Sequence, residues 1–184
     1  VLDAPAVVLN CPANQTEPAC QTQAAVDAAY SVWLASATSS GGCNATVSNN
    51  GGSAPPACGG SKTVTWTVTS SCEPDVTCSA VFTVTTAPPV VLTCPANQTE
   101  PVCQTQAVID AAYSAWLALA SSDGGCNTSI SNNGGTAPPA CGGSKTVTWT
   151  VTSTCEPLVT CSAVFTVIAA PAVTVNCPNN QVQA

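Results

Sequence analysis

The sequence predicts a mainly β protein built from tandem repeats, each an antiparallel β-sandwich with one inserted α-helix. Two observations favour this fold class. A long block of sequence returns at a constant spacing, and Thr-rich segments alternate apolar and polar residues as half-buried strands do. A third observation is the content of 13 cysteines, which suits small domains whose cores need disulfides.

The repeat organises the chain. The segment CPANQTEPACQTQAAVDAAY begins at Cys11 and returns nearly unchanged from Cys94, 83 residues later, and every cysteine follows the same shift. The period predicts the tail of a preceding repeat at 1–5, repeats at 6–88 and 89–171, and the first strand of a third repeat at 172–184. We therefore expect a window on a longer array. Short Pro-containing stretches, APA or APP, are expected as stiff linkers.

The elements at the start of a repeat are read from its second copy. Residues 90–94 are expected as a short strand. Ile109, Tyr113 and Trp116 fall at helical spacing, in a helix that begins at Thr99 or Thr105 and ends near Ala120 before two glycines.

The rest of the repeat is expected to be β structure and turns. The Asn, Gly and Pro residues of 126–141 indicate a hairpin and loops. Residues 146–153 alternate strictly and predict a half-buried strand, 155–161 a turn, and 162–167 a last strand. Strands at both ends with Thr-rich outward faces favour an immunoglobulin-like sandwich.

The cysteines are expected to form disulfides rather than to bind a metal, because their spacings lack the C-x-x-C pairs of zinc sites. The predicted disulfide residues are Cys11, Cys20, Cys43, Cys58, Cys72, Cys78, Cys94, Cys103, Cys126, Cys141, Cys155, Cys161 and Cys177. Such a framework places the protein outside the cell or in another oxidising compartment.

About three disulfides per repeat are expected, with the pairing left open. The first hypothesis joins Cys155 to Cys161, Cys126 to Cys141, and Cys94 to Cys103. The rival joins Cys94 to Cys161 or to the preceding repeat. If the first cysteine of each repeat pairs backward, Cys177 is bonded and Cys11 is free, whereas Cys177 is free if pairing stays inside repeats. A Cys141–Cys155 bond is excluded because the strand between them would span about 33 Å.

The composition excludes several classes of function. Only 6% of the residues are charged, Lys and Arg number 2 against 9 Asp and Glu, the net charge is -7, and histidine is absent. The chain lacks a basic surface for nucleic acid or anionic membrane. Without histidine and with few carboxylates, no nucleophile can be paired with a base, so we expect neither an enzyme nor a cofactor. We also expect no membrane span and no signal peptide in the chain.

The repeat resembles the HYR and HYR-like modules in its CPANQTE opening, its TVTWTVTS strand and its CSAVFTV ending before an APP linker. These modules are immunoglobulin-like repeats of very large secreted surface proteins, notably adhesins of gliding and surface-attached Bacteroidota. The resemblance covers essentially the whole repeat, although the module usually has fewer cysteines and no helix carrying a residue such as Trp33. It implies a structural segment of an extracellular adhesin or fibre, with neighbouring repeats and like chains as partners, and no catalytic residue.

Other residues are candidates for binding or modification. Four N-x-Ser/Thr triplets make Asn14, Asn44, Asn97 and Asn127 candidate N-glycosylation acceptors, although such triplets also arise by chance in a Thr-rich chain. The alternative function is recognition of a glycan or host surface by the Asn/Gly-rich loops, such as SNNGG.

Three further sets of residues are weighed against simpler roles. Glu73 and Asp75 resemble the start of a cation site, but the counterpart of Asp75 is Leu158, so calcium is not expected. Asp27 and Asp110 are expected on a solvated helix face rather than as general bases. Trp33 and Trp116, at helical spacing with Tyr30 and Tyr113, are expected in the core rather than as sugar-stacking platforms.

Overall fold

The computed structural model describes residues 4–177, which divide into two compact units. The first unit comprises the chain up to Val90 together with two loops of the second repeat, Gly124–Thr128 and Thr152–Pro157. The second unit comprises Val91–Asp123, Ser129–Val151 and the chain from Leu158 onward. We call Gly124–Thr128 and Thr152–Pro157 the junction loops.

Each repeat has one helix and six strands within the described residues, in the same order. The first repeat has β1 (Val8–Asn10), β2 (Gln15–Glu17), α1 (Gln23–Leu34), β3 (Thr38–Ser40), β4 (Thr46–Asn49), β5 (Gly60–Thr69) and β6 (Val76–Val84). The second has β7 (Val91–Thr93), β8 (Gln98–Glu100), α2 (Gln106–Leu117), β9 (Ser121–Asp123), β10 (Ser129–Asn132), β11 (Gly143–Thr152) and β12 (Val159–Val167). The prediction of a mainly β chain with one helix per repeat is confirmed.

Two sheets form in each repeat. In the first repeat, four strands pair in the order β2-β6-β5-β4, and β1 pairs separately with β3. The second repeat has the same arrangement, with a sheet in the order β8-β12-β11-β10 and a separate pair β7-β9. The long central strands are antiparallel, with Val64 opposite Ala80 and Trp66 opposite Cys78. The short strands β2 and β8 pair in parallel with β6 and β12. The predicted antiparallel pairing is therefore confirmed for β4, β5 and β6, whereas β2 pairs in parallel at the edge of β6.

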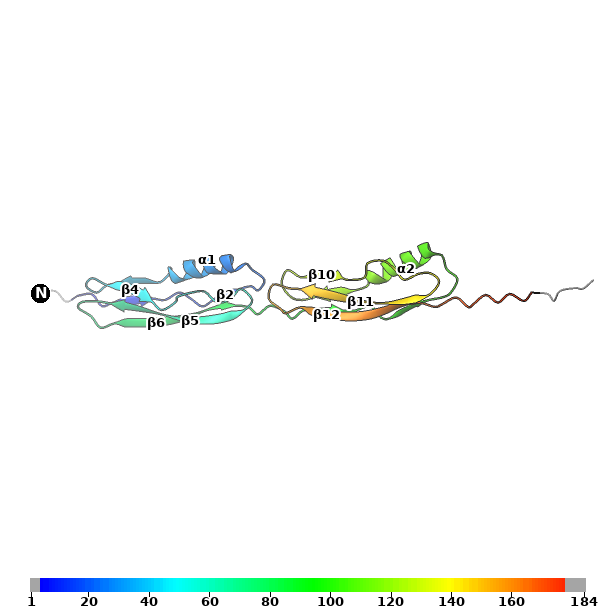
Figure 1. Cartoon of the computed structure of the whole chain (residues 1–184). Helices are drawn as coiled ribbons and strands as arrows, with labels where there is room; N and C mark the ends of the chain where they lie inside the picture. The colour runs from blue at the N-terminus through cyan, green and yellow to red at the C-terminus, as the bar shows by residue number, and fades with distance from the viewer. Residues whose placement is uncertain (1–3, 178–184) are drawn as a thin grey trace, which may run out of the picture. The chain divides into compact units, whose positions relative to one another are not determined.

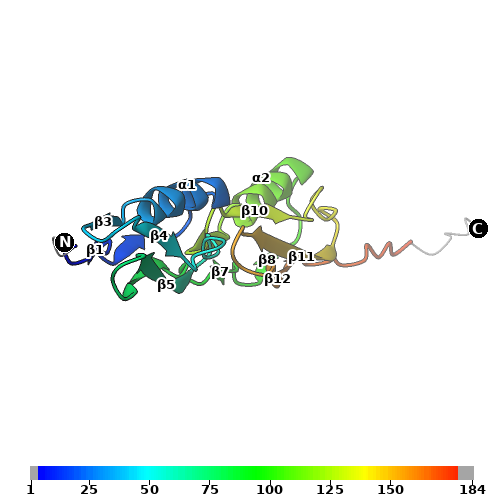
Figure 2. The same ribbon diagram turned by 90° about the vertical axis from the view of Figure 1, so that its left-hand side faces the viewer.

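The core lies between one face of the four-stranded sheet and the helix. Helix α1 lies over the sheet in both views of the first repeat (Figures 1 and 2). Alternate residues of β5 and β6 point toward it, and Val26, Tyr30 and Trp33 of α1 meet them at spacings of four and three residues. The opposite face of the sheet carries Thr and Ser side chains. The core of the first repeat comprises Val26, Tyr30, Trp33, Ala57, Val64, Trp66, Ala80, Phe82 and Val84.

Aromatic rings fill most of this core. Trp33 meets Trp66 edge-on with ring centroids 5.0 Å apart, and Tyr30 meets Phe82 edge-on at 5.1 Å. Both distances lie within the range of favourable aromatic pairs. The indole nitrogen of Trp33 donates to the carbonyl of Ala13 at 2.8 Å, so its polar edge is satisfied although the side chain is buried. Trp116 has the same role in the second repeat, which confirms both tryptophans as core residues.

The helix begins where one of the two predicted starts places it. Thr105 is the N-cap of α2, and its Oγ1 accepts from the backbone N–H of Val108. The start at Thr99 is wrong because that residue belongs to β8, and the helix ends at Leu117, before Ala120. Leu119 projects into solvent and β9 follows at once, so the last apolar residues extend the periodic pattern without extending the helix.

The chain beyond the second repeat contains no strand over residues 172–177, where the first strand of a third repeat was predicted. The remainder of that prediction, residues 178–184, lies outside the described residues, as do residues 1–3 of the predicted tail. Neither helix in the described part of the chain has the length and apolar character needed to cross a membrane.

Candidate functional site: the disulfide-bonded junction loops

Five disulfides form among the described residues, and they are of two kinds. Three join cysteines of the same repeat: Cys11–Cys78, Cys43–Cys72 and Cys94–Cys161. Two join the first repeat to the junction loops of the second: Cys20–Cys126 and Cys58–Cys155. The disulfides indicate an oxidising environment, extracellular or secreted.

The Cys94–Cys161 bond confirms one form of the rival pairing. Cys161 lies in β12 on the face of Ala163, Phe165 and Val167, so its sulfur points into the core and meets Cys94 just after β7. The Cys155–Cys161 hypothesis is wrong because Cys161 belongs to this strand and not to the turn before it.

The remaining parts of the first hypothesis are also wrong. Cys126 bonds to Cys20 rather than to Cys141, and Cys94 does not bond to Cys103. Backward pairing of the first cysteine is wrong as well, since Cys11 bonds within its own repeat. Cysteines from other positions make the bonds between repeats.

Three cysteines of the predicted disulfide set carry no disulfide: Cys103, Cys141 and Cys177, all exposed. Cys103 and Cys141 are the counterparts of Cys20 and Cys58, whose own partners, Cys126 and Cys155, lie in the junction loops of the second repeat. About three disulfides per repeat were expected; among the described residues the first repeat has two internal disulfides, the second has one, and two more join the repeats.

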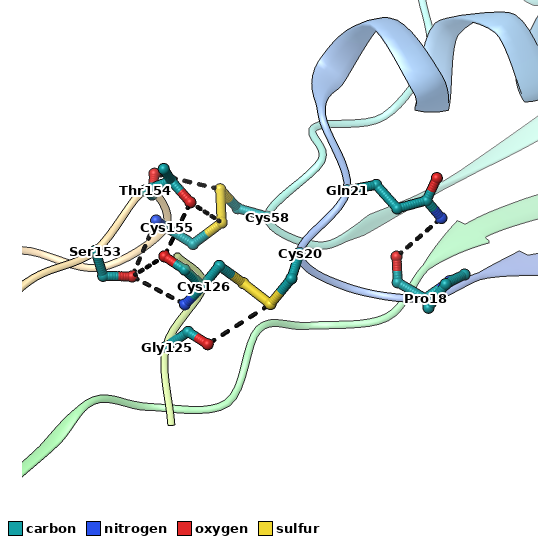
Figure 3. Close-up of a disulfide and its surroundings, with 9 residues drawn as sticks. All are labelled: Pro18, Cys20, Gln21, Cys58, Gly125, Cys126, Ser153, Thr154 and Cys155. Atoms are coloured by element: carbon teal, nitrogen blue, oxygen red, sulfur yellow. Dashed lines mark hydrogen bonds between the residues drawn. A yellow bond between two sulfur atoms is a disulfide. The ribbon is translucent and has the colours of Figure 1, made fainter. Parts of the chain in front are cut away.

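The two bonds to the junction loops have ordinary disulfide geometry. The Cα atoms of Cys20 and Cys126 are 4.9 Å apart, and those of Cys58 and Cys155 are 5.2 Å apart. Figure 3 shows the bonds side by side, with Cys20 leading into helix α1 and Cys58 leading toward the sheet. Cys126 is 1% exposed, so its side chain is buried where the junction loop meets the first repeat.

Hydroxyl groups hold the junction loops to each other. Ser153 Oγ accepts from the N–H of Cys126 at 3.0 Å and donates to the Cys126 carbonyl at 3.1 Å. The N–H and the hydroxyl of Thr154 also donate to that carbonyl, at 3.0 and 3.2 Å (Figure 3). The loops therefore present Cys126 and Cys155 as one unit to the first repeat.

The linker between repeats contacts the first junction loop. The Pro88 carbonyl accepts from the N–H of Gly125 at 2.9 Å. Gly124 has φ +71°, and a Cβ atom there would lie 2.0 Å from the carbonyl oxygen of Pro89. Only glycine fits this close approach, which explains the Gly-Gly pair before each of the cysteines Cys43 and Cys126.

The receiving side of the junction is also shaped by local backbone. Cys20 has φ +68°, a left-handed conformation uncommon for residues other than glycine, and it lies two residues before the helix cap Thr22. Gln23 then ties the start of α1 to the segment before Cys58, since its Oε1 accepts from the N–H of Ala57 at 2.9 Å and its Nε2 donates to Pro55. We call 18–22 and 55–59 the receiving segments, with counterparts 101–105 and 138–142.

The candidate glycosylation residues are all exposed but differ in what their side chains do. Asn14 Oδ1 accepts from the N–H of Val81 at 2.8 Å, and Asn97 does the same for Val164, so both side chains hold the chain against the last strand of the sheet. This structural role has no signal in the N-x-Thr triplet. Asn44 and Asn127 lie in loops at φ +55° and +51°.

The remaining candidate residues are the carboxylates that the sequence singled out. Within residues 4–177, no group of three or more cysteine, aspartate or glutamate side chains lies close enough to hold a metal ion. Asp27 is exposed on α1 and accepts from Gln23 Nε2 at 2.9 Å; Asp110 and Gln106 repeat this pair on α2. Glu73 and Asp75 belong to no such group in the described part of the chain.

Fold and junction together define a mainly β, disulfide-linked tandem-repeat protein. No protein-family model matches the chain, and a search of curated proteins finds no match to it.

Proposed function

We propose that this chain is a structural repeat segment of a long extracellular adhesin or fibre, in which each repeat is an HYR-like, immunoglobulin-like β-sandwich. The observation that carries the proposal is the pair of disulfides, Cys20–Cys126 and Cys58–Cys155, that joins one repeat to the loops of the next. Such bonds add two covalent connections to the peptide linker, which suits a protein that transmits tension at a cell surface.

Surface chemistry supports the same function. The outward sheet face presents Thr and Ser hydroxyls, with Thr65 and Ser79 hydrogen-bonded across strands at 2.8 Å. Only 6% of the residues are charged, so the edges of the sheets carry few of the lysines that discourage pairing with other strands. These features suit a protein that associates laterally with its own kind.

A protease site inserted between Pro88 and Pro89 tests whether the bonds between repeats hold the repeats together and transmit tension. Among the disulfides of residues 4–177, Cys20–Cys126 and Cys58–Cys155 alone span this position. We expect the cleaved, oxidised chain to remain one species without reductant and to transmit force in single-molecule pulling. The matched variant Cys20→Ser/Cys58→Ser should separate into two fragments after the same cleavage. Separation of the unsubstituted chain under non-reducing conditions would refute the proposal.

The second candidate function is glycan binding, and a hollow beside the Asn/Gly loop of each repeat favours it. The hollows measure about 260 and 220 Å³. Asp27, Ser31 and Ser53 line the first, and Asp110, Ser114 and Thr136 line the second. A carboxylate beside hydroxyls suits hydrogen bonding to sugar hydroxyls. A glycan array probed with the chain and with Asp27→Ala/Asp110→Ala should show binding that the variant loses, and a blank array would remove this candidate.

A further inference from the structure

The receiving segments of the second repeat are formed as if a partner were present. Cys103 has φ +65° and Cys20 has φ +68°, although only Cys20 is bonded. Gly142 and Gly59 match in the same way, at φ +123° and +127°. A left-handed conformation is unfavourable for a residue with a side chain. The unbonded receiving segment thus has, at Cys103, the same backbone conformation that the bonded receiving segment has at Cys20.

The opposite end of the first repeat is also formed in advance. Its counterparts of the junction loops, 41–45 and 69–74, carry Cys43 and Cys72, which bond to each other with Cα atoms 5.6 Å apart. The Cys43 N–H donates to Ser70 Oγ at 3.0 Å, as the Cys126 N–H does to Ser153. The same loop conformation therefore occurs in two bonding states: closed on itself in the first repeat and bonded to another repeat in the second.

We propose that Cys103 and Cys141 of one copy of the chain bond to Cys43 and Cys72 of a second copy, joining copies head to tail. This inference rests on the proposed function and names the partner and the bonds. Repeat equivalence fixes the pairing, since Cys20–Cys126 corresponds to Cys103–Cys43 and Cys58–Cys155 corresponds to Cys141–Cys72. The surface with Cys103 and Cys141 differs from the surface with Cys43 and Cys72. Two joined copies therefore still have one unbonded surface of each kind, and the assembly grows as an open polymer.

The chemistry proceeds in two steps. The thiolate of Cys103 attacks the sulfur of Cys43 in the second copy; the Cys43–Cys72 bond breaks, and Cys72 leaves as a thiolate, with no net oxidation. The thiols of Cys141 and Cys72 are then joined by exchange with a low-molecular-weight disulfide such as oxidised glutathione. That oxidant accepts two electrons and two protons and leaves as two glutathione thiols.

Incubating the purified 184-residue chain with oxidised and reduced glutathione tests the proposal. Gels run without reductant should show a ladder of multimers that collapses to monomer on reduction. Cys103→Ser/Cys141→Ser should abolish the ladder. Cys177→Ser removes the third exposed thiol and should leave the ladder intact, and peptides from the dimer band should contain Cys103 joined to Cys43.

Either of two results would overturn the proposal: a ladder that survives in Cys103→Ser/Cys141→Ser, or no ladder from both the original chain and Cys177→Ser. Failure here is distinguishable from failure of the proposed function. If the linker-cleaved chain stays together but no ladder forms, repeats are joined within a chain while copies are not. If the cleaved chain separates, the bonds between repeats are themselves absent.

Discussion

At the scale of the residue, the direction in which a cysteine points decides its partner. Cys161, Ala163 and Phe165 are every second residue of β12 and share one face of the strand. The place of Cys161 in the core could therefore be predicted from the sequence, by continuing the alternation of buried and exposed residues toward the start of the strand. The role of Cys20 could not, because it depends on a left-handed backbone conformation that the sequence around it does not signal.

Burial of the two tyrosines predicts how the protein responds to alkali. Burial raises the pKa of Tyr30 and of Tyr113 above 10, and each hydroxyl donates to a glycine carbonyl, Gly51 or Gly134, at 3.0 Å. Since the folded pKa exceeds the unfolded one, the contribution to stability is complete below pH 10 and is lost as pH rises through the folded pKa.

Tyrosinate absorbance measures this directly because the chain has 2 tyrosines, both buried in the same setting. The native chain should titrate above pH 10, together with the loss of its folded signal, whereas the reduced, urea-unfolded chain should titrate near 10. A native titration midpoint at or below that of the unfolded chain would contradict the burial of these hydroxyls.

Gly124 is predicted to be indispensable for the junction. Gly124→Ala places a Cβ atom 2.0 Å from the Pro89 carbonyl oxygen, which forces the first junction loop away from the linker. Thiol titration should then detect Cys20 and Cys126 in addition to the three unbonded cysteines.

Gly52→Ala is the matched control for that variant. Gly52 also has a positive φ, +59°, but a Cβ atom there would meet only Lys62 Nζ at 3.5 Å. The two variants share a conformational cost of about 1–2 kcal/mol, so a difference between them isolates the steric clash. Equal thiol counts in both variants would show that the contact with Pro89 is not needed.

At the scale of the element, long periodic segments are predictable and three-residue strands are not. The helix and the two long strands carry their own pattern of buried residues over about ten positions, which a sequence shows directly. Strands such as β2, β3 and β9 form because a distant edge offers hydrogen bonds, and polar triplets such as Gln15–Glu17 show no alternation of their own. The parallel pairing of β2 was missed for this reason.

The contact of helix with sheet should carry much of the stability of a repeat. Phe82 is fully buried between Tyr30 and Trp33, so Phe82→Ala is expected to lower the free energy of unfolding by about 3–5 kcal/mol. Thr63→Ala, on the exposed face of the neighbouring strand, should change it by at most about 0.5 kcal/mol. Urea unfolding with the disulfides intact measures both, and similar losses in the two variants would contradict the placement of the core on one face.

At the scale of the whole molecule, the repeat period is visible in the sequence but the bonds between repeats are not. Equivalent cysteines have different partners: Cys43 bonds to Cys72, whereas their counterparts Cys126 and Cys155 bond to the preceding repeat. A period assigns every copy the same environment, so it cannot distinguish equivalent cysteines that have different partners. Only the folded structure shows which cysteines the junction loops bring to Cys20 and Cys58.

Disulfide mapping of the oxidised chain tests this central claim most directly. Digestion with pepsin at acid pH, where disulfide exchange is slow, followed by mass spectrometry without reduction should yield peptides that join Cys20 to Cys126 and Cys58 to Cys155. Peptides in which Cys126 is joined to Cys155, with Cys20 and Cys58 free or joined to each other, would show that the repeats are closed on themselves and would contradict the account.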